Sequence, residues 1–222
     1  MQTFWRSALV AVGLAAFAVT AQAAPIEAGD TFRVTGGGSI RGGEFAITST
    51  TTPASFDPFI TFCIEVAQTI RVPGGPYTVA ALAKQTSTGT ALSGGAAYLY
   101  TQFAAGTLTG YSAAKQNALQ AALWKFQGYD AFVISPGVTV ASYVAGSADA
   151  TAYMNLAGAQ AWQAANTTGR VFIMQNVNAQ GVHKQDFLMV QPVPEPASLA
   201  LLGLGLAGAI VRRRRTRCPP SA

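Results

Sequence analysis

The sequence predicts a mixed, β-rich fold: one globular β-sandwich or barrel-like domain with two or three helices. Gly, Ala, Thr and Ser abound in a chain of which only 10% of the residues are charged. This composition is common in extracellular β-rich proteins. Short runs of β-branched and aromatic residues also alternate with Gly- and Pro-rich breaks, which is the pattern of strands joined by turns.

Strands are predicted where apolar and β-branched residues cluster between such breaks, at residues 31–34, 45–49, 60–66, 77–82, 171–177 and 187–190. Two glycine runs, at 36–38 and 42–43, suit the turn between the first two strands. The prolines and glycines of 73–76 are expected to break the chain before the fourth strand.

Helical spacing of apolar residues predicts the clearest helix after Ser112, its expected N-cap, with Gly128 ending it. Its apolar stripe consists of Leu119, Ala122, Leu123 and Phe126. A second helix is expected at 98–103 after Gly94 and Gly95, and a third at 147–165 with Ser147 as its cap. Residues 183–186 are expected to form a solvated turn before the last strand.

The first 23 residues have the layout of a signal peptide. Arg6 forms a basic n-region, residues 8–19 are apolar, and Ala21 and Ala23 form a small-x-small cleavage site. Cleavage by signal peptidase is expected after Ala23, because cutting one residue later would place Pro25 just after the scissile bond. The mature domain is therefore predicted to span residues 24–191.

The last 31 residues, 192–222, combine three features with separate physical roles. Pro194, Glu195 and Pro196 resist joining a helix. Residues 199–211 carry no charge and favour hydrocarbon over water. The permanently charged Arg212, Arg213, Arg214 and Arg215 hold the C-terminus on the cytoplasmic side.

The apolar span is short for a permanent anchor. Residues 197–211 give about 22 Å of helix, against a hydrocarbon core of ~30 Å. The region resembles the PEP-CTERM sorting signal of Gram-negative bacteria, and the alternative is an ordinary tail anchor with a chance Pro-Glu-Pro. The resemblance implies processing by exosortase, a membrane protease. It also implies transient anchoring in the inner membrane and a final place at the cell surface or outside the cell.

The net charge of +5 belongs to the two targeting segments. Between residues 24 and 193, eight Lys or Arg balance eight Asp or Glu. A neutral domain offers no electrostatic reason to bind nucleic acid. With one histidine and one cysteine in this domain, a zinc site and a histidine-based catalytic triad are not expected. We expect no cofactor, no metal and no catalytic residue, and thus no enzyme.

Cys63 is the only cysteine of the predicted mature domain, since Cys218 lies beyond the arginines. An unpaired thiol in an oxidising compartment calls for an explanation. Strand alternation places an apolar set on one face and a more polar set on the other: Phe62, Ile64 and Val66 against Thr61, Cys63 and Glu65. Cys63 is therefore expected to point away from the most apolar face.

Gln120 lies at the border of the apolar stripe of the clearest helix, with Gln116 one turn before it and Trp124 one turn after it. The segments 62–65 (Phe-Cys-Ile-Glu) and 119–124 (Leu-Gln-Ala-Ala-Leu-Trp) resemble the paired motifs of bacterial thioester domains. The resemblance implies that Cys63 and Gln120 condense to a thioester, supported by Phe62 and Trp124. The sequence does not identify the groups that would polarise the Gln120 carbonyl.

Two classes of function follow. In the first, the domain is a covalent adhesion module whose thioester acylates an amine on a surface partner. In the second, Cys63 and Gln120 are ordinary packed residues, and the domain is a noncovalent structural or exopolysaccharide-associated matrix protein.

Overall fold

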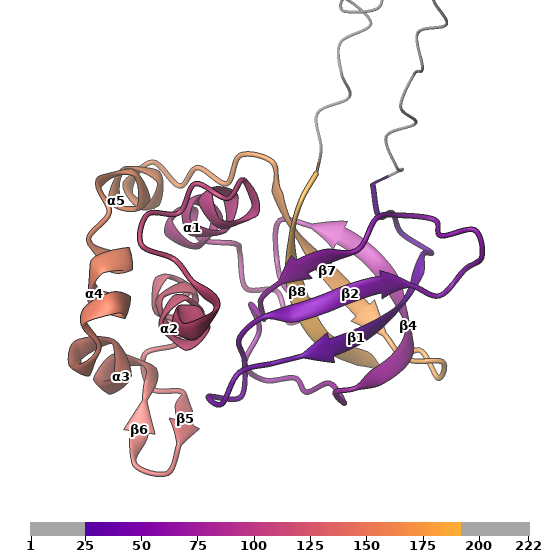
Figure 1. The fold of residues 1–222 in the computed structure, drawn as a ribbon, viewed down its shortest axis with the longest axis horizontal. Helices are drawn as coiled ribbons and strands as arrows, with labels where there is room; N and C mark the ends of the chain where they lie inside the picture. The colour runs from indigo at the N-terminus through magenta and orange to yellow at the C-terminus, as the bar shows by residue number, and fades with distance from the viewer. Residues whose placement is uncertain (1–24, 192–222) are drawn as a thin grey trace, which may run out of the picture.

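The computed structural model describes residues 25–191, which form a curled antiparallel sheet with five α-helices gathered at one side of it (Figure 1). The six strands follow the order β3-β2-β1-β4-β7-β8. Their bounds are β1 (Thr31–Gly36), β2 (Phe45–Ser49), β3 (Phe59–Thr61), β4 (Gly74–Ala83), β7 (Val171–Val177) and β8 (His183–Val190). The predicted β-rich mixed class is confirmed.

The helices are α1 (Gly94–Ala104), α2 (Gln116–Phe126), α3 (Val140–Gly146), α4 (Ala148–Met154) and α5 (Ala157–Ala164). A 3-10 turn (Ala113–Lys115) precedes α2, and a small hairpin of β5 (Val133–Ser135) and β6 (Val138–Thr139) precedes α3. No helix within residues 25–191 has the length and apolar character needed to cross a bilayer.

The two ends of the curled sheet meet through the segment that follows β3. The N–H of Ile64 donates to the Asp186 carbonyl (3.0 Å), and the N–H of Leu188 donates to the Phe62 carbonyl (3.1 Å). Cys63 lies between them, opposite Phe187. The chain therefore pairs first with β2 and then, a few residues later, with β8, which draws the sheet into a barrel-like curl.

The core fills the space inside the curl and between the sheet and the helices. Alternate strand residues such as Phe32, Val34 and Ile47 are fully buried, as expected for strands with one face turned inward. Phe62 packs edge-on against Phe103 of α1, with 5.0 Å between ring centroids. That contact joins the closing segment of the sheet to the helical side.

Small residues let the helices approach one another closely. A Cβ added at Gly94 of α1 would overlap the carbonyl oxygen of Trp162 in α5, and one at Gly95 would overlap the ring of Phe126 in α2. Ser93 caps α1 by accepting a hydrogen bond from the N–H of Ala96. The two glycines, expected to precede the helix, are therefore its first turn.

The strands predicted at 45–49 and 171–177 are confirmed residue for residue, but other predictions are corrected. Two or three helices were expected in the domain and five are present within residues 25–191, because α3 was missed and the 147–165 segment is two helices. Asn155 and the extended backbone of Leu156 break that segment. Ser147 caps α4 as predicted, whereas Ser112 makes no side-chain capping bond.

The expected solvated turn at 183–186 is wrong, since these residues begin β8. Gln185 and Asp186 are buried, with hydrogen-bond partners that their polar sequence does not reveal. The expected break at 73–76 is also wrong in part, because β4 already starts at Gly74. The strand predicted at 60–66 is shortened by the change of partner from β2 to β8.

Gly94→Ala tests the close contact between α1 and α5. The new methyl group meets backbone, which cannot rotate aside, so we expect the free energy of unfolding to fall by about 1–3 kcal/mol in urea titrations. Gly146→Ala is the matched control, because no atom lies within 4 Å of its added Cβ. Equal stability of the two variants would contradict the described packing.

Candidate functional site

Cys63 lies on the closing segment of the sheet with its backbone turned toward the helices. Its neighbours Phe62 and Ile64 use their carbonyl and N–H for β8. In an extended chain the groups of the intervening residue point the other way. The N–H and the carbonyl of Cys63 therefore need a partner that is not β8.

The side-chain carboxamide of Gln120, from the middle of α2, is that partner. The Cys63 N–H donates to Oε1 of Gln120 (3.1 Å), and Nε2 of Gln120 donates to the Cys63 carbonyl (2.8 Å). The N–H of Gly43 also donates to Oε1 (3.1 Å). Gln120 is completely buried, so these bonds fix its carboxamide against Cys63 and place two N–H donors on its carbonyl oxygen.

The loop between β1 and β2 brings Gly43 to this position. Gln116, one helical turn before Gln120, accepts a hydrogen bond from the N–H of Glu44 (2.9 Å). Gly43 has a φ of +116°, which favours glycine, and a Cβ on it would overlap Gly38 and Gln116. The paired glutamines of α2 and the glycines of the loop thus hold the second donor in place.

Gly42 allows the loop to lie against the carboxamide. A Cβ at this position would come within 2.8 Å of Oε1 of Gln120 and of the Trp124 ring. The sequence predicts Gly42 and Gly43 only as turn residues and does not reveal the backbone donor at Gly43. The sole signal for it was the run of glycines itself, which does not specify what the loop approaches.

The Cys63 side chain is 1% exposed and borders a cavity of about 450 Å³. Burial raises the pKa of the thiol well above its usual value, and a backbone hydrogen bond opposes this only in part. The thiol is therefore protonated at neutral pH. Its position on the cavity wall still gives a small reactant a route to the sulfur.

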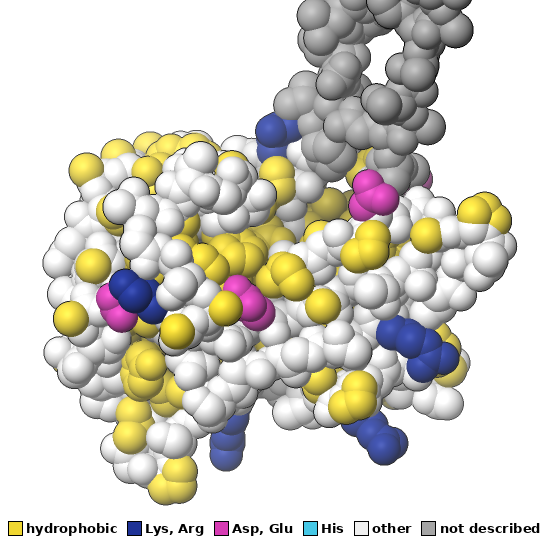
Figure 2. All heavy atoms as spheres, viewed as in Figure 1, with side chains coloured by type: hydrophobic (Ala, Val, Ile, Leu, Met, Phe, Trp, Pro, Cys, Tyr) yellow, Lys and Arg dark blue, Asp and Glu magenta, His cyan; other side chains and the backbone are white. Residues whose placement is uncertain are grey.

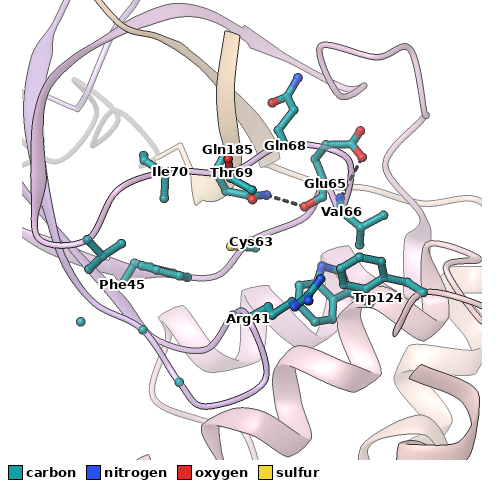
Figure 3. A pocket seen from close by; sticks show the side chains of 16 residues that line it. Arg41, Phe45, Cys63, Glu65, Val66, Gln68, Thr69, Ile70, Trp124 and Gln185 are labelled. Carbon is teal, nitrogen blue, oxygen red and sulfur yellow. Dashed lines mark hydrogen bonds between the residues drawn. The ribbon is translucent and has the colours of Figure 1, made fainter. Parts of the chain in front are cut away.

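The cavity has an aromatic and cationic side and a polar side. Figure 3 shows Arg41 and Trp124 on one side of Cys63, with Glu65 and Gln185 on the other. Trp124 packs edge-on against Phe132 (5.3 Å between centroids), so its indole forms a fixed wall. Arg41 is solvent-exposed and brings positive charge to this side.

Glu65 lies two residues beyond Cys63 and is 2% exposed. Its Oε1 accepts from the N–H groups of Val66 (2.8 Å) and Ala67 (2.9 Å), and its Oε2 accepts from the Thr88 hydroxyl. Burial alone raises the pKa of Glu65, but these hydrogen bonds outweigh it, so that the pKa lies below its usual value. Glu65 is a locked carboxylate that shapes the cavity wall and is poorly suited to act as a base.

Asp186 forms a second buried carboxyl near Glu65. Its Oδ2 accepts from the N–H (2.7 Å) and hydroxyl (2.8 Å) of Ser87, whereas its buried Oδ1 has no partner among residues 25–191. Burial raises the pKa of Asp186, and the charge of Glu65 adds to this effect. In the described part of the chain, no three His, Cys, Asp or Glu side chains come together as a metal-binding group.

The structure thus brings Cys63, Gln120 and Trp124 together, while Phe62 is placed differently. Phe62 packs against Phe103 and does not line the cavity, so any support from it acts through the position of the closing segment. The other predicted sites lie outside the described residues: Ala21, Ala23, Pro194, Glu195, Pro196 and the arginines 212–215.

Gln120→Ala tests whether the carboxamide holds the sheet to the helices, and Cys63→Ala serves as the background because it cannot form a thioester. Removing the carboxamide leaves three buried backbone groups unpaired, so the free energy of unfolding should fall by about 3 kcal/mol in urea titrations. Gln160→Ala, at an exposed position in α5, should change it by less than ~0.5 kcal/mol. A similar small effect of both substitutions would contradict the described role.

Asp186→Asn tests the buried carboxyl. A raised pKa in the folded state favours the protonated form, so this group stabilises the fold at low pH and loses that contribution as the pH rises through the folded pKa. The free energy of unfolding of the parent protein should therefore fall relative to that of Asp186→Asn between about pH 4 and pH 7. A difference that stays constant or grows over this range would show that burial does not raise this pKa.

Comparison with known proteins identifies a motif at the C-terminal end of the chain but finds no relative of the domain. The family model described as the PEP-CTERM protein-sorting motif matches residues 192–215. No curated protein matches the chain, and no solved structure matches it. The matched motif is that of an exported protein, which is processed by exosortase and anchored transiently at the membrane before release.

Proposed function

We propose that the exported domain is a covalent adhesion module, in which Sγ of Cys63 and Cδ of Gln120 are joined as an internal thioester. The observation that carries this proposal is the fixed carboxamide of Gln120, bound to the backbone of the residue that bears the thiol. Fixed proximity replaces a bimolecular encounter and removes much of its entropic cost.

A carboxamide carbon is a weak electrophile, and the two N–H groups that bind Oε1 would polarise its carbonyl. Attack of sulfur on Cδ moves charge onto Oε1, where the N–H groups of Cys63 and Gly43 already point. Preorganised donors of this kind stabilise such an oxyanion. Collapse of the intermediate breaks the bond from Cδ to Nε2, and the thiol proton leaves with the nitrogen. The products are one thioester and one molecule of ammonia.

Burial favours the condensed form once it is made. The thiolate is disfavoured at this position, as the raised pKa of Cys63 indicates, whereas the thioester carries no charge. Gln120 is fully buried, so water has poor access to the acyl carbon. Such a bond reacts once with a partner and does not turn over, and the protein is accordingly not an enzyme in this proposal.

The reactant that we propose is a primary amine on a surface partner. Cys63 lines the cavity but Gln120 does not, so an amine in the cavity would reach Cδ when the wall at Cys63 opens. It would then form an amide with Gln120 and release the Cys63 thiol. The proposed setting is the cell surface or extracellular matrix of a Gram-negative bacterium, reached after signal peptidase and exosortase act at the inner membrane. The sorting motif supports this setting.

The second candidate is a noncovalent matrix protein associated with exopolysaccharide. The observation that favours it is that the carboxamide of Gln120 already satisfies both backbone groups of Cys63 without any reaction. In that case Gln120 serves the fold alone, as a substitute for the missing neighbouring strand, and Cys63 stays a free thiol.

The intact mass of the secreted protein separates the two candidates. A thioester predicts a mass below that of the processed chain by one ammonia molecule. Methylamine should then add to Gln120 and release a thiol at Cys63 that labels quantitatively. Cys63→Ala and Gln120→Ala should each restore the full mass, because either change removes one of the two reacting groups.

Gln160→Ala is the control, since this exposed glutamine of α5 bonds to the Met154 carbonyl and has no contact with Cys63, Gln120 or the Gly43 loop. Its mass should keep the deficit of one ammonia. Full ammonia mass in the parent protein, together with complete labelling of Cys63 under native conditions, would remove the thioester and leave the noncovalent candidate.

A further inference from the structure

A second cavity, of about 540 Å³, lies beside the first, where β1, the start of β4 and the β7–β8 turn meet. Its lining includes Thr35 of β1, Arg71, Tyr77 of β4 and Gln180 from the β7–β8 turn, together with Arg33. Neighbouring residues line the two cavities in alternation: Ile70 and Val72 face the first, whereas Arg71 faces the second. The same short stretch of chain is therefore a shared wall.

Neighbouring residues fix the stem of Arg33 and the main chain of Arg71. The stem of Arg33 lies over Gly75, where a Cβ would come within 3.3 Å of the Arg33 Cγ. The hydroxyl of Tyr77 accepts from the N–H of Arg71 and donates to its carbonyl, both at 3.3 Å. These contacts position both residues at the cavity although their side chains are exposed.

Their charges are not neutralised within the cavity. No Asp or Glu is among the residues that line it, and the two ion pairs of residues 25–191 involve Lys115 and Lys125 instead. Figure 2 shows Lys and Arg side chains, with no Asp or Glu, along the lower edge of the molecule. Two guanidinium groups beside one cavity favour an anion that accepts from both.

We infer that this cavity binds a carboxylate-bearing saccharide, such as a segment of a uronic acid polymer. Guanidinium groups pair with carboxylates through two parallel hydrogen bonds. The amide of Gln180 and the hydroxyl of Thr35 suit sugar hydroxyl groups, and the volume lies in the range of small-ligand sites of ~300–1,000 Å³.

The sheet makes an acidic peptide the poorer fit. Pairing with a free sheet edge is one way in which an extended peptide gains affinity, through main-chain hydrogen bonds. β1 is paired on both sides, with β2 and β4, and β4 is paired with β1 and β7. The strands of this cavity therefore offer no free edge, and recognition must come from side chains. The inference does not require the thioester, because it uses no residue of the Cys63 site.

Binding of tetragalacturonate to the secreted protein, measured by calorimetry at low salt, tests the inference. We compare Arg33→Gln/Arg71→Gln with the charge-matched control Arg170→Gln/Lys184→Gln, whose two cations lie outside the cavity. The first double variant should bind at least about tenfold more weakly than the parent, through loss of charged hydrogen bonds. The control should bind within about twofold of the parent.

Maltotetraose, a neutral sugar of the same length, and hexaglutamate provide the ligand controls. Both should bind more weakly than tetragalacturonate, and added salt should weaken tetragalacturonate binding. Absence of tetragalacturonate binding, equal losses in the two double variants, or tighter binding of hexaglutamate would each overturn the inference. The mass of the parent protein reports on the thioester separately, so failure of one proposal is distinguishable from failure of the other.

Discussion

The structure depends on one buried carboxamide that occupies the place of a missing strand. The segment at Cys63 is hydrogen-bonded to β8 on one side only, and on its other side the Gln120 side chain supplies both the acceptor and the donor that a neighbouring peptide group would supply. Buried backbone groups without partners are costly. The curl of the sheet and the packing of α2 therefore depend on the same hydrogen bonds. The loop that carries Gly43 is held by one more bond to the same carboxamide.

The hydrogen bonds that hold this carboxamide are also those on which the proposed thioester chemistry depends. Oε1 of Gln120 receives two donors, one of them from the cysteine itself, and these are the donors that the proposed oxyanion would use. Burial keeps the thiol protonated and the Gln120 carboxamide away from water, and Cys63, but not Gln120, lines the neighbouring cavity. Structural need and proposed reactivity thus use the same three hydrogen bonds.

The sequence reveals the part of the site that is carried by a short motif. The motif resemblance pairs Cys63 with Gln120, and the two are hydrogen-bonded, whereas strand alternation assigns Val66 to the other face from Cys63 although both line the same cavity. The donor at Gly43 was not predictable, because a backbone N–H carries no side-chain signature and its position depends on a contact 77 residues away in sequence. Asp186 was assigned to a turn for a similar reason, since the partners that permit its burial lie elsewhere in the chain.

The side-chain amide of Gln120 offers the most direct test, by NMR of protein labelled with ¹⁵N at glutamine side chains. In Cys63→Ala the account predicts a Gln120 amide signal that exchanges slowly with solvent, because Nε2 is buried and bonded to a carbonyl. In the parent protein that signal should be missing, because Nε2 has left as ammonia. A Gln120 signal in the parent protein would contradict the thioester, and rapid exchange in Cys63→Ala would contradict the buried carboxamide on which the fold itself depends.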